Sequence, residues 1–254
     1  MLRGEAQAVP HALVRSAVAG VDGCRSGWVV ARLDPAAPRD RQAQPHVTVA
    51  LAPDIATVRT LTDACAAVAI DIPIGLPDAA QRRCDQLVRA ALGPRRASVF
   101  PAPPRATLRA TSYAEACRLA RAATGRALSL QAYHLLPKIA AVDTALRDDP
   151  AWAARVHEVH PELAFACLDG GRPMPHPKRH PQGAADRRAL VEALFPGAFA
   201  RGRTTVPRRA AADDDILDAL VCLWSAGRLA TRGALRFPED APHDAVGLPM
   251  RIQA

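Results

Sequence analysis

The amino-acid sequence predicts an α/β protein with a mixed sheet, in which a three-strand meander is followed by a helix and a fourth strand parallel to the first. Three observations support this fold class. Short apolar runs rich in β-branched residues alternate with turn residues in the first 75 positions, helical spacing of apolar residues dominates afterwards, and two of the apolar runs end in an aspartate. We expect helices on both faces of the sheet, because a central strand is apolar throughout.

The first three strands are predicted to form the meander. Residues 17–22 are apolar up to a final acid, residues 23–27 form a glycine-bounded turn, and residues 28–33 return as the second strand. A loop over residues 34–45 then leads to residues 46–51, which alternate between polar and apolar side chains. A hairpin extended by a third antiparallel strand follows from this order.

A helix and a fourth strand complete the central part of the prediction. Asp54 is placed to cap a helix that ends near Cys65. Residues 66–70 are small and apolar, as in a strand covered on both faces, and Asp71 closes the run before two prolines and a glycine. This strand should run parallel to the first, so that Asp71 lies at its carboxyl end, where ligands usually bind in α/β sheets.

The rest of the chain is predicted to be mainly helical, with one more strand parallel to the fourth. A helical insert over about residues 78–150, broken by a proline-rich segment, follows the fourth strand. The predicted helices cover residues 78–92, 113–124, 130–146, 184–194 and 213–229. Within residues 152–165, strand character resumes around residues 155–159 and is stopped by Pro161. Residues 170–183 and 196–212 are predicted to be irregular, and the tail from Phe237 has no clear pattern. Residues 1–16 are expected to be a flexible leader before one domain over residues 17–254.

Composition places the chain among globular proteins of the cytoplasm. Its 254 residues are 49% hydrophobic, enough for one substantial core. No apolar run approaches the roughly 20 residues that span a bilayer, so we expect no membrane partner. Six scattered cysteines without a C-x-x-C pair predict reduced core thiols, as in the cytoplasm, and neither a disulfide framework nor a zinc site.

The net charge of +8 is concentrated in one segment. Between Arg82 and Arg126 there are ten arginines and only two acids. Such a basic face predicts a polyanionic partner, such as nucleic acid, or else a solvated arginine-rich helical surface. The arginines that flank turns and the proline-rich segment are our candidates for substrate contact: Arg83, Arg95, Arg96 and Arg105.

The acids at the strand ends are the candidate catalytic residues. Asp22 and Asp71 would lie close together if their strands are parallel neighbours about 4.8 Å apart. Asp215 and Asp218 are three residues apart on one side of the last helix. Two strand-end aspartates and an acid from a packed helix suit Mg²⁺ or Mn²⁺, and ions held in this way can activate water for phosphodiester hydrolysis.

Each acid also has a structural interpretation. Asp22 can be an ordinary turn residue, and acids at a helix start are favoured by capping and by the helix dipole. Glu158 is a candidate further ligand on the fifth strand and can equally be an exposed strand residue. The choice between Asp215 and Asp218 as the ligand stays open.

Several segments together resemble one bacterial family. The matching segments are residues 20–28, 71–77, 83–85, 98–103, 137–139, 158–162 and 214–220, which resemble domain-of-unknown-function family 429, a family of predicted nucleases with a ribonuclease H-like fold. The resemblance implies acids arranged as in ribonuclease H and the Holliday-junction resolvases, with Asp22, Asp71 and either Asp215 or Asp218 as the metal-binding set. Lys138 and Lys178 are the expected substrate-binding lysines. The chain has Lys178-Arg179 where two adjacent lysines are expected.

The leading hypothesis is therefore a metal-dependent nuclease or phosphodiester hydrolase that uses Mg²⁺ or Mn²⁺. One alternative is a non-catalytic nucleic-acid-binding or regulatory protein on the same fold, although an aromatic content of 4% provides few platforms for stacking bases. Another is a phosphotransfer enzyme related to actin and the sugar kinases, for which the chain is short and has no second glycine-rich loop. DNA, RNA and small phosphorylated substrates remain open, as does the oligomeric state, a homodimer included.

Overall fold

The computed structural model of the protein describes residues 16–35 and 46–254. The predicted leader therefore falls outside the described residues up to position 15, and so does most of the predicted loop before the third strand. All other predicted elements can be compared with the structure.

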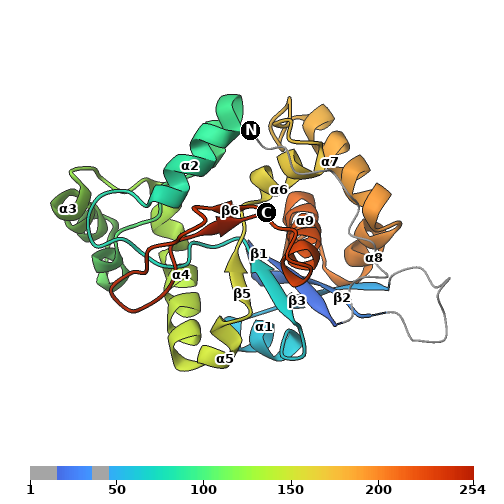
Figure 1. The fold of residues 1–254 in the computed structure, drawn as a ribbon, viewed down its shortest axis with the longest axis horizontal. Coiled ribbons are helices and arrows are strands. Elements are labelled where there is room, and N and C mark those ends of the chain that lie inside the picture. The colour runs from blue at the N-terminus through green and yellow to red at the C-terminus, as the bar shows by residue number, and fades with distance from the viewer. Residues whose placement is uncertain (1–15, 36–45) are drawn as a thin grey trace.

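A five-stranded mixed sheet forms the centre of the molecule, in the order β3-β2-β1-β4-β5 (Figure 1). The first three strands, β1 (Val18–Cys24), β2 (Gly27–Leu33) and β3 (Val47–Ala52), form an antiparallel meander. β4 (Ala67–Ile70) pairs parallel to β1, and β5 (Val156–Glu158) pairs parallel to β4. The predicted α/β class, with a meander and two parallel strands, is confirmed.

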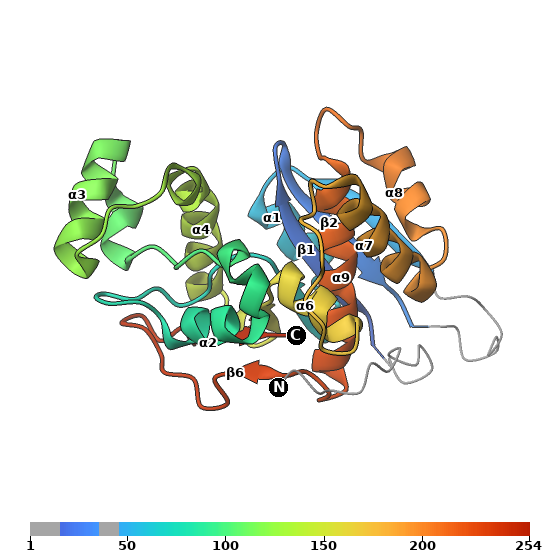
Figure 2. The same cartoon turned by 90° about the horizontal axis from the view of Figure 1, so that it is seen from above.

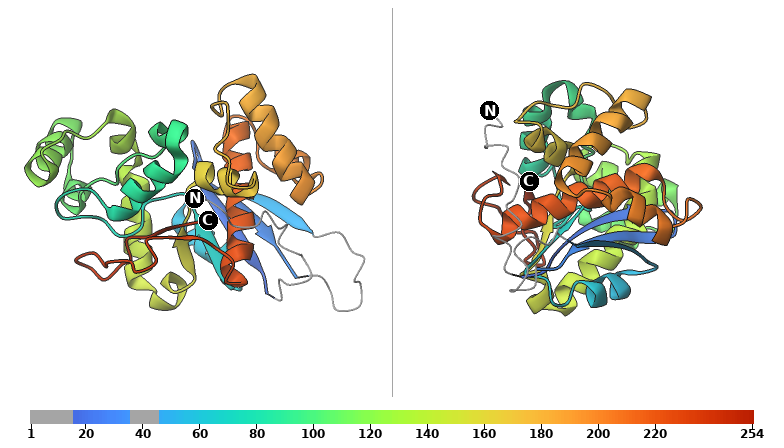
Figure 3. Two further views of the ribbon diagram at one scale, coloured as in Figure 1. Left: turned by 45° about the horizontal axis from the view of Figure 1, so that its top comes forward. Right: turned by 90° about the vertical axis from the view of Figure 1, so that its right-hand side faces the viewer.

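Helices cover both faces of this sheet (Figure 3). On one face α9 packs along β1 and β4 and α8 packs on β3, with α6 and α7 beside α9. On the other face α1, α4 and α5 enclose a second core cluster with β1, β2 and β4. The bounds are α1 Ile55–Leu61, α4 Leu130–Asp148, α5 Pro150–Ala153, α6 Pro161–Leu168, α7 Pro181–Leu194, α8 Ala198–Thr205 and α9 Asp213–Ala230.

Alternation along β1 decides which side chains face α9. Ala19 and Val21 lie in the core cluster with α4, whereas Val18 belongs to the cluster with α9. Because successive strand residues point to opposite faces, Asp22 shares the α9 face with Val18. An acid at this position therefore meets α9 and not the helices of the opposite face.

Gly20 lets α9 approach the sheet unusually closely. A Cβ atom at this position would lie 2.0 Å from the Leu223 nitrogen and 2.2 Å from the Ala219 carbonyl oxygen. Both are backbone atoms of α9, so no side-chain movement can relieve the clash. The absence of a side chain at Gly20 thus sets how α9, and the acids at its start, sit against β1.

The predicted insert lies between β4 and β5. It contains α2 (Arg83–Leu92), short 3-10 segments over Gly93–Ser98 and Arg105–Arg109, and α3 (Tyr113–Thr124) before α4. Figure 2 shows α2, α3 and α4 at the opposite end of the molecule from α7 and α8, with α2 packed on α6 and in the core of the α9 face. The insert is not a separate layer throughout, because Ile139, Val142 and Leu146 of α4 belong to the sheet core.

The structure adds three helices, α5, α6 and α8, and a small second sheet that the sequence patterns do not predict. Helix α6 begins at Pro161, where the pattern predicts the stop of a strand; proline is in fact well suited to the first helical position, where its missing N–H is not needed. Helix α8 lies in the segment predicted to be irregular. In the tail, β6 (Arg236–Phe237) pairs with β7 (Ile252–Gln253).

All six cysteines are free thiols and all are buried. Their separate positions agree with the predicted absence of a disulfide framework. In the part of the chain that the structure describes, no helix combines the length and the apolar character needed to cross a bilayer.

Candidate active site

The carboxyl ends of β1 and β4 bring Asp22 and Asp71 together. Val21 is opposite Ile70 in the parallel pair, and the Asp71 N–H donates a hydrogen bond of 2.9 Å to the Val21 carbonyl. The next residue of each strand therefore stands at the same level, and each of the two carboxyl groups is close enough to shift the pKa of the other. The sequence predicts that these two acids lie close together, and the structure places them side by side on neighbouring parallel strands.

Asp218 supplies the third carboxyl group from α9. Its side chain is buried although it is an aspartate within the first two turns of a helix. It acts on the pKa of both Asp22 and Asp71 by charge repulsion. The strand ends and the helix thus converge on one group of three carboxyls: Asp22, Asp71 and Asp218, called the carboxylate cluster below.

Burial and mutual repulsion disfavour the ionised forms of the cluster. Burial, followed by the charges of Asp218 and Asp71, raises the pKa of Asp22 well above its usual range. Burial and Asp218 raise the pKa of Asp71 to about 7, and the hydrogen bond from Asp22 partly offsets this. Perturbed carboxyls gathered at the end of a sheet are typical of functional sites, because a protein gains no stability from them.

Lys178 is the cation that faces this cluster. Its Nζ lies 2.7 Å from Asp218 Oδ2 and 3.1 Å from Asp214 Oδ2. Burial alone would lower the pKa of Lys178, but the charges of Asp218, Asp22 and Asp214 raise it above its usual value. The sequence predicts that Lys178 binds substrate; in this structure it is engaged with the acids.

The remaining acids at the start of α9 have different roles. Asp215 accepts a hydrogen bond of 2.7 Å from the Ala212 N–H, as a residue of the first helical turn often does. Asp218 is the deeper of the two candidate ligands, so the structure favours it over Asp215. Sequence reasoning gave Asp214 only a capping role and missed its ion pair with Lys178; the run of three aspartates at the helix start was the available signal.

Glu158 does not join the carboxylate cluster. It is opposite Ile70 in the sheet, and Ile70 faces the α4 core, so the Glu158 carboxylate points to the other face from Asp22. Both of its oxygens bond the buried Arg82 guanidinium, at 2.7 and 2.8 Å, and the Ile74 N–H donates to it at 2.7 Å. The predicted catalytic role is therefore replaced by a buried salt bridge that fixes the loop after β4.

Two of the four candidate substrate arginines are held by acids of the protein. Arg95 Nε lies 2.8 Å from Glu162, which also pairs with the buried Arg187. Arg105 pairs with Asp143 at 2.7 Å and with Asp244 at 2.5 Å. The expectation that these two arginines face a substrate is corrected accordingly, because their charges are neutralised by carboxylates far away in sequence.

Arg83 and Arg96 are exposed, and neither makes an ion pair among the described residues. Lys138 lies beside the β1–β2 hairpin: its Nζ donates to the Gly27 carbonyl at 2.8 Å and sits 4.9 Å from the centre of the Trp28 ring. These three side chains are the candidate substrate-binding residues that are not committed to a carboxylate of the described chain.

The residues present fit a hard divalent cation by their chemistry. The cluster offers only oxygen donors. The ammonium of Lys178 contacts Asp214 and Asp218, and its charge also lowers the pKa of three further aspartates, Asp22, Asp71 and Asp215. Within the described ranges, no three histidine, cysteine or acidic side chains already have the arrangement of a metal site. The Lys178 ammonium is bound to the oxygens of Asp218 and Asp214.

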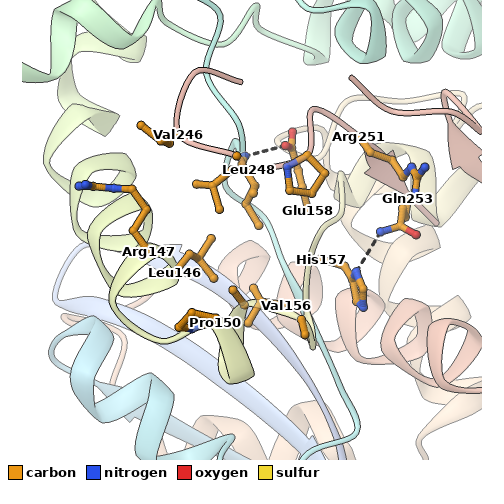
Figure 4. A pocket seen from close by; sticks show the side chains of 15 residues that line it. Leu146, Arg147, Pro150, Val156, His157, Glu158, Val246, Leu248, Arg251 and Gln253 are labelled. Atoms are coloured by element: carbon orange, nitrogen blue, oxygen red, sulfur yellow. Dashed lines mark hydrogen bonds between the residues drawn. The ribbon is translucent and has the colours of Figure 1, made fainter. Parts of the chain in front are cut away.

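A cavity of about 570 Å³ lies elsewhere, beside β5 and the C-terminal segment (Figure 4). Leu146, Val156 and Leu248 line it, and Figure 4 shows His157 hydrogen-bonded to Gln253 at its wall. Burial and the charges of two arginines lower the pKa of His157 to about 4, so the ring is neutral. The residues that line this cavity include none of the five aspartates, so it is separate from the carboxylate cluster.

Fold and site together define an α/β protein whose carboxylate cluster lies at the carboxyl ends of two parallel strands. The chain belongs to the family described as "Protein of unknown function (DUF429)", whose model matches residues 20–243. No curated protein and no solved structure matches the chain. The family predicted from the sequence motifs is thereby confirmed.

Proposed function

We propose that this protein is a metal-dependent hydrolase of phosphodiester bonds with a ribonuclease H-like fold. The strand order β3-β2-β1-β4-β5, with acids at the ends of β1 and β4 and on the last long helix, supports this assignment. Nucleic acid is the proposed substrate class. Six free buried thiols support a reducing, cytoplasmic setting.

One observation carries the proposal: three carboxyls, from β1, from the end of β4 and from α9, converge although their charges repel each other, with Asp22 and Asp218 buried and Asp71 partly exposed. Burying an uncompensated carboxylate costs several kcal/mol in the absence of a partner cation. A purely structural site would relax this cost by substitution with amides or apolar residues. A bound divalent cation would offset the repulsion between the carboxylates and would give the cluster a catalytic role.

Asp22, Asp71 and Asp218 would hold Mg²⁺ or Mn²⁺, which when bound supplies Lewis-acid activation of water and of the phosphoryl oxygen. Gly20 keeps α9 against β1 and thereby holds Asp218 beside Asp22. The Arg82–Glu158 salt bridge fixes the loop that follows Asp71. The protein thus positions the three carboxylates from rigid elements, as precise catalysis requires.

The direct test is hydrolysis by the purified full-length protein. We expect cleavage of at least one of single-stranded DNA, duplex DNA, branched DNA or RNA with Mg²⁺ or Mn²⁺, and none with excess EDTA. Asp218→Asn should reduce the rate to background, because it removes one carboxylate and keeps the shape of the side chain. Equal cleavage by this variant would identify a contaminating nuclease or a site elsewhere.

Arg83 and Arg96 are expected to bind the phosphate backbone. The double variant Arg83→Ala/Arg96→Ala should bind nucleic acid more weakly and lower the slope of log K against log salt by about 0.9 for each phosphate that the protein no longer neutralises. A titration of affinity from low to moderate salt measures this. Arg121→Ala/Arg126→Ala removes the same charge from exposed positions of the insert and should leave the slope nearly unchanged; identical slopes for the two double variants would refute a specific role for Arg83 and Arg96.

A second candidate is a non-catalytic nucleic-acid-binding protein on the same fold. The ion pairs of Lys178 with Asp218 and Asp214 favour it, because they already neutralise part of the cluster. Salt-dependent binding without cleavage under any divalent cation would support this function over hydrolysis.

A further inference from the structure

Lys178 is held in place by more than its ion pairs. It lies in the loop before α7, where the buried Arg187 donates a hydrogen bond of 3.0 Å to the His176 carbonyl. His180 Nδ1 accepts a hydrogen bond from the Gln182 N–H at the start of α7. The backbone on both sides of Lys178 is therefore anchored.

Gly183 adds a third anchor. A Cβ atom there would lie 2.2 Å from the Pro177 carbonyl oxygen, so only glycine allows α7 to meet the loop this closely. Three independent contacts around residues 176–180 thus fix the loop that carries Lys178. The Lys178 side chain itself is 42% exposed, so the anchored backbone and the two ion pairs are what hold its ammonium at the acids.

Arg179, the positively charged residue next to Lys178, does not contact the acids. Arg179 is exposed and makes no ion pair or hydrogen bond among the described residues. Lys178, one position earlier, reaches two aspartates. The loop therefore directs one of its two adjacent positive charges at the cluster and leaves the other in solvent.

We propose that the Lys178 ammonium is a built-in cation of the carboxylate cluster, which neutralises Asp218 and Asp214 in the metal-free protein and competes with a divalent metal ion for the same oxygens. This inference rests on the proposed function and adds a means of regulation to it. Metal binding then requires the ion pair between Lys178 and Asp218 to break, so the carboxylate cluster binds no metal at low metal concentration.

Metal affinity tests the competition without any measurement of activity. Isothermal titration with Mn²⁺ should give about tenfold tighter binding to Lys178→Met than to the wild type, because the positive charge that pairs with Asp218 is removed. Lys178→Arg keeps the charge and should bind as weakly as the wild type. Arg179→Met loses the same charge from the same loop without touching the acids, and its affinity should stay within about twofold of the wild type.

Amine labelling of the wild-type protein gives a second measurement, which does not depend on a variant that folds. Lys138 and Lys178 are the only lysines, so mass spectrometry resolves them after acylation. Saturating Mn²⁺ should speed the labelling of Lys178 severalfold and leave Lys138, which is bonded to Gly27, as an internal reference.

The outcomes separate this inference from the proposed function. Lys178 does not compete with the metal if the wild type binds Mn²⁺ and Lys178→Met binds it no more tightly. The same conclusion follows if Mn²⁺ leaves the labelling of Lys178 unchanged. In both cases the proposal of metal-dependent hydrolysis is unaffected. If neither the wild type nor Lys178→Met binds Mn²⁺ at millimolar concentration, both proposals are wrong.

Discussion

Asp71→Asn is expected to abolish divalent-dependent hydrolysis and, in the same protein, to increase the stability of the metal-free fold above neutral pH. The two effects have one cause. The Asp71 carboxylate is needed to hold the metal, and without metal its charge is repelled by Asp218 and poorly hydrated. A residue that served only the structure would lose stability on this substitution.

The pH dependence follows from the direction of the pKa shift. The pKa of Asp71 is about 7 in the folded protein and roughly 3.9 in an unfolded chain. The folded state therefore binds a proton that the unfolded state has lost, so the wild type becomes less stable as pH rises from about 4 to about 7, and the loss is complete above that. At about 1.4 kcal/mol for each pKa unit, the ceiling is about 4 kcal/mol; partial exposure of Asp71 to water reduces our expectation to about 2 kcal/mol.

Urea unfolding in EDTA at about pH 5 and about pH 8 measures this difference. The advantage of Asp71→Asn over the wild type should be larger at the higher pH. Asp78→Asn is the matched control, because Asp78 is exposed, has no partner among the described residues and should show neither effect. A variant of Asp71 that is less stable at both pH values, or that hydrolyses nucleic acid at the wild-type rate, would rule out the metal-site interpretation.

The sheet and two of its acids were predictable because they depend on local patterns. β-branched apolar runs identified β1 to β5 to within about two residues, and an acid at the end of a buried run was enough to select Asp22 and Asp71. Parallel pairing of the two strands then places both acids at the same level without further information.

The partners of the charged residues could not be predicted in the same way. Arg105 and Asp244 are 139 positions apart, and Arg82 and Glu158 are 76 apart. Nothing in the neighbouring sequence distinguishes these arginines from Arg83 or Arg96, which stay exposed. Tertiary packing decides which charges are neutralised, so a basic segment in the sequence overestimates the basic surface of the fold.

Two of the helices that the sequence does not predict, α6 and α8, have local physical reasons. Pro161 suits the end of a strand, but it suits the first position of a helix equally well. In α8, Gly202 and two threonines give a poor helix propensity. Packing overrides it, since Gly202 lies against Val49 of β3 and Phe199 is buried.

Gly20→Ala is expected to be among the most damaging single substitutions in the sheet. The added methyl group would meet two backbone atoms of α9 at 2.0 and 2.2 Å. The helix must therefore shift as a unit, which separates Asp218 from Asp22 and opens the core around Trp224. We expect a loss of about 3 kcal/mol or more of unfolding free energy, at the upper end for an overpacked core, together with loss of metal-dependent hydrolysis.

Urea unfolding and the hydrolysis assay measure the two parts of this prediction, and near-ultraviolet circular dichroism of the buried tryptophans reports the packing of the core around Trp224. Gly233→Ala is the matched control: a Cβ atom there meets nothing closer than 3.8 Å, and its stability should change by less than about 1 kcal/mol. If Gly20→Ala is as stable as the control and keeps its dichroism, α9 does not pack on β1 as closely as described. Asp218 would then lie too far from Asp22 and Asp71 to share a cation with them, because the same helix position sets both contacts.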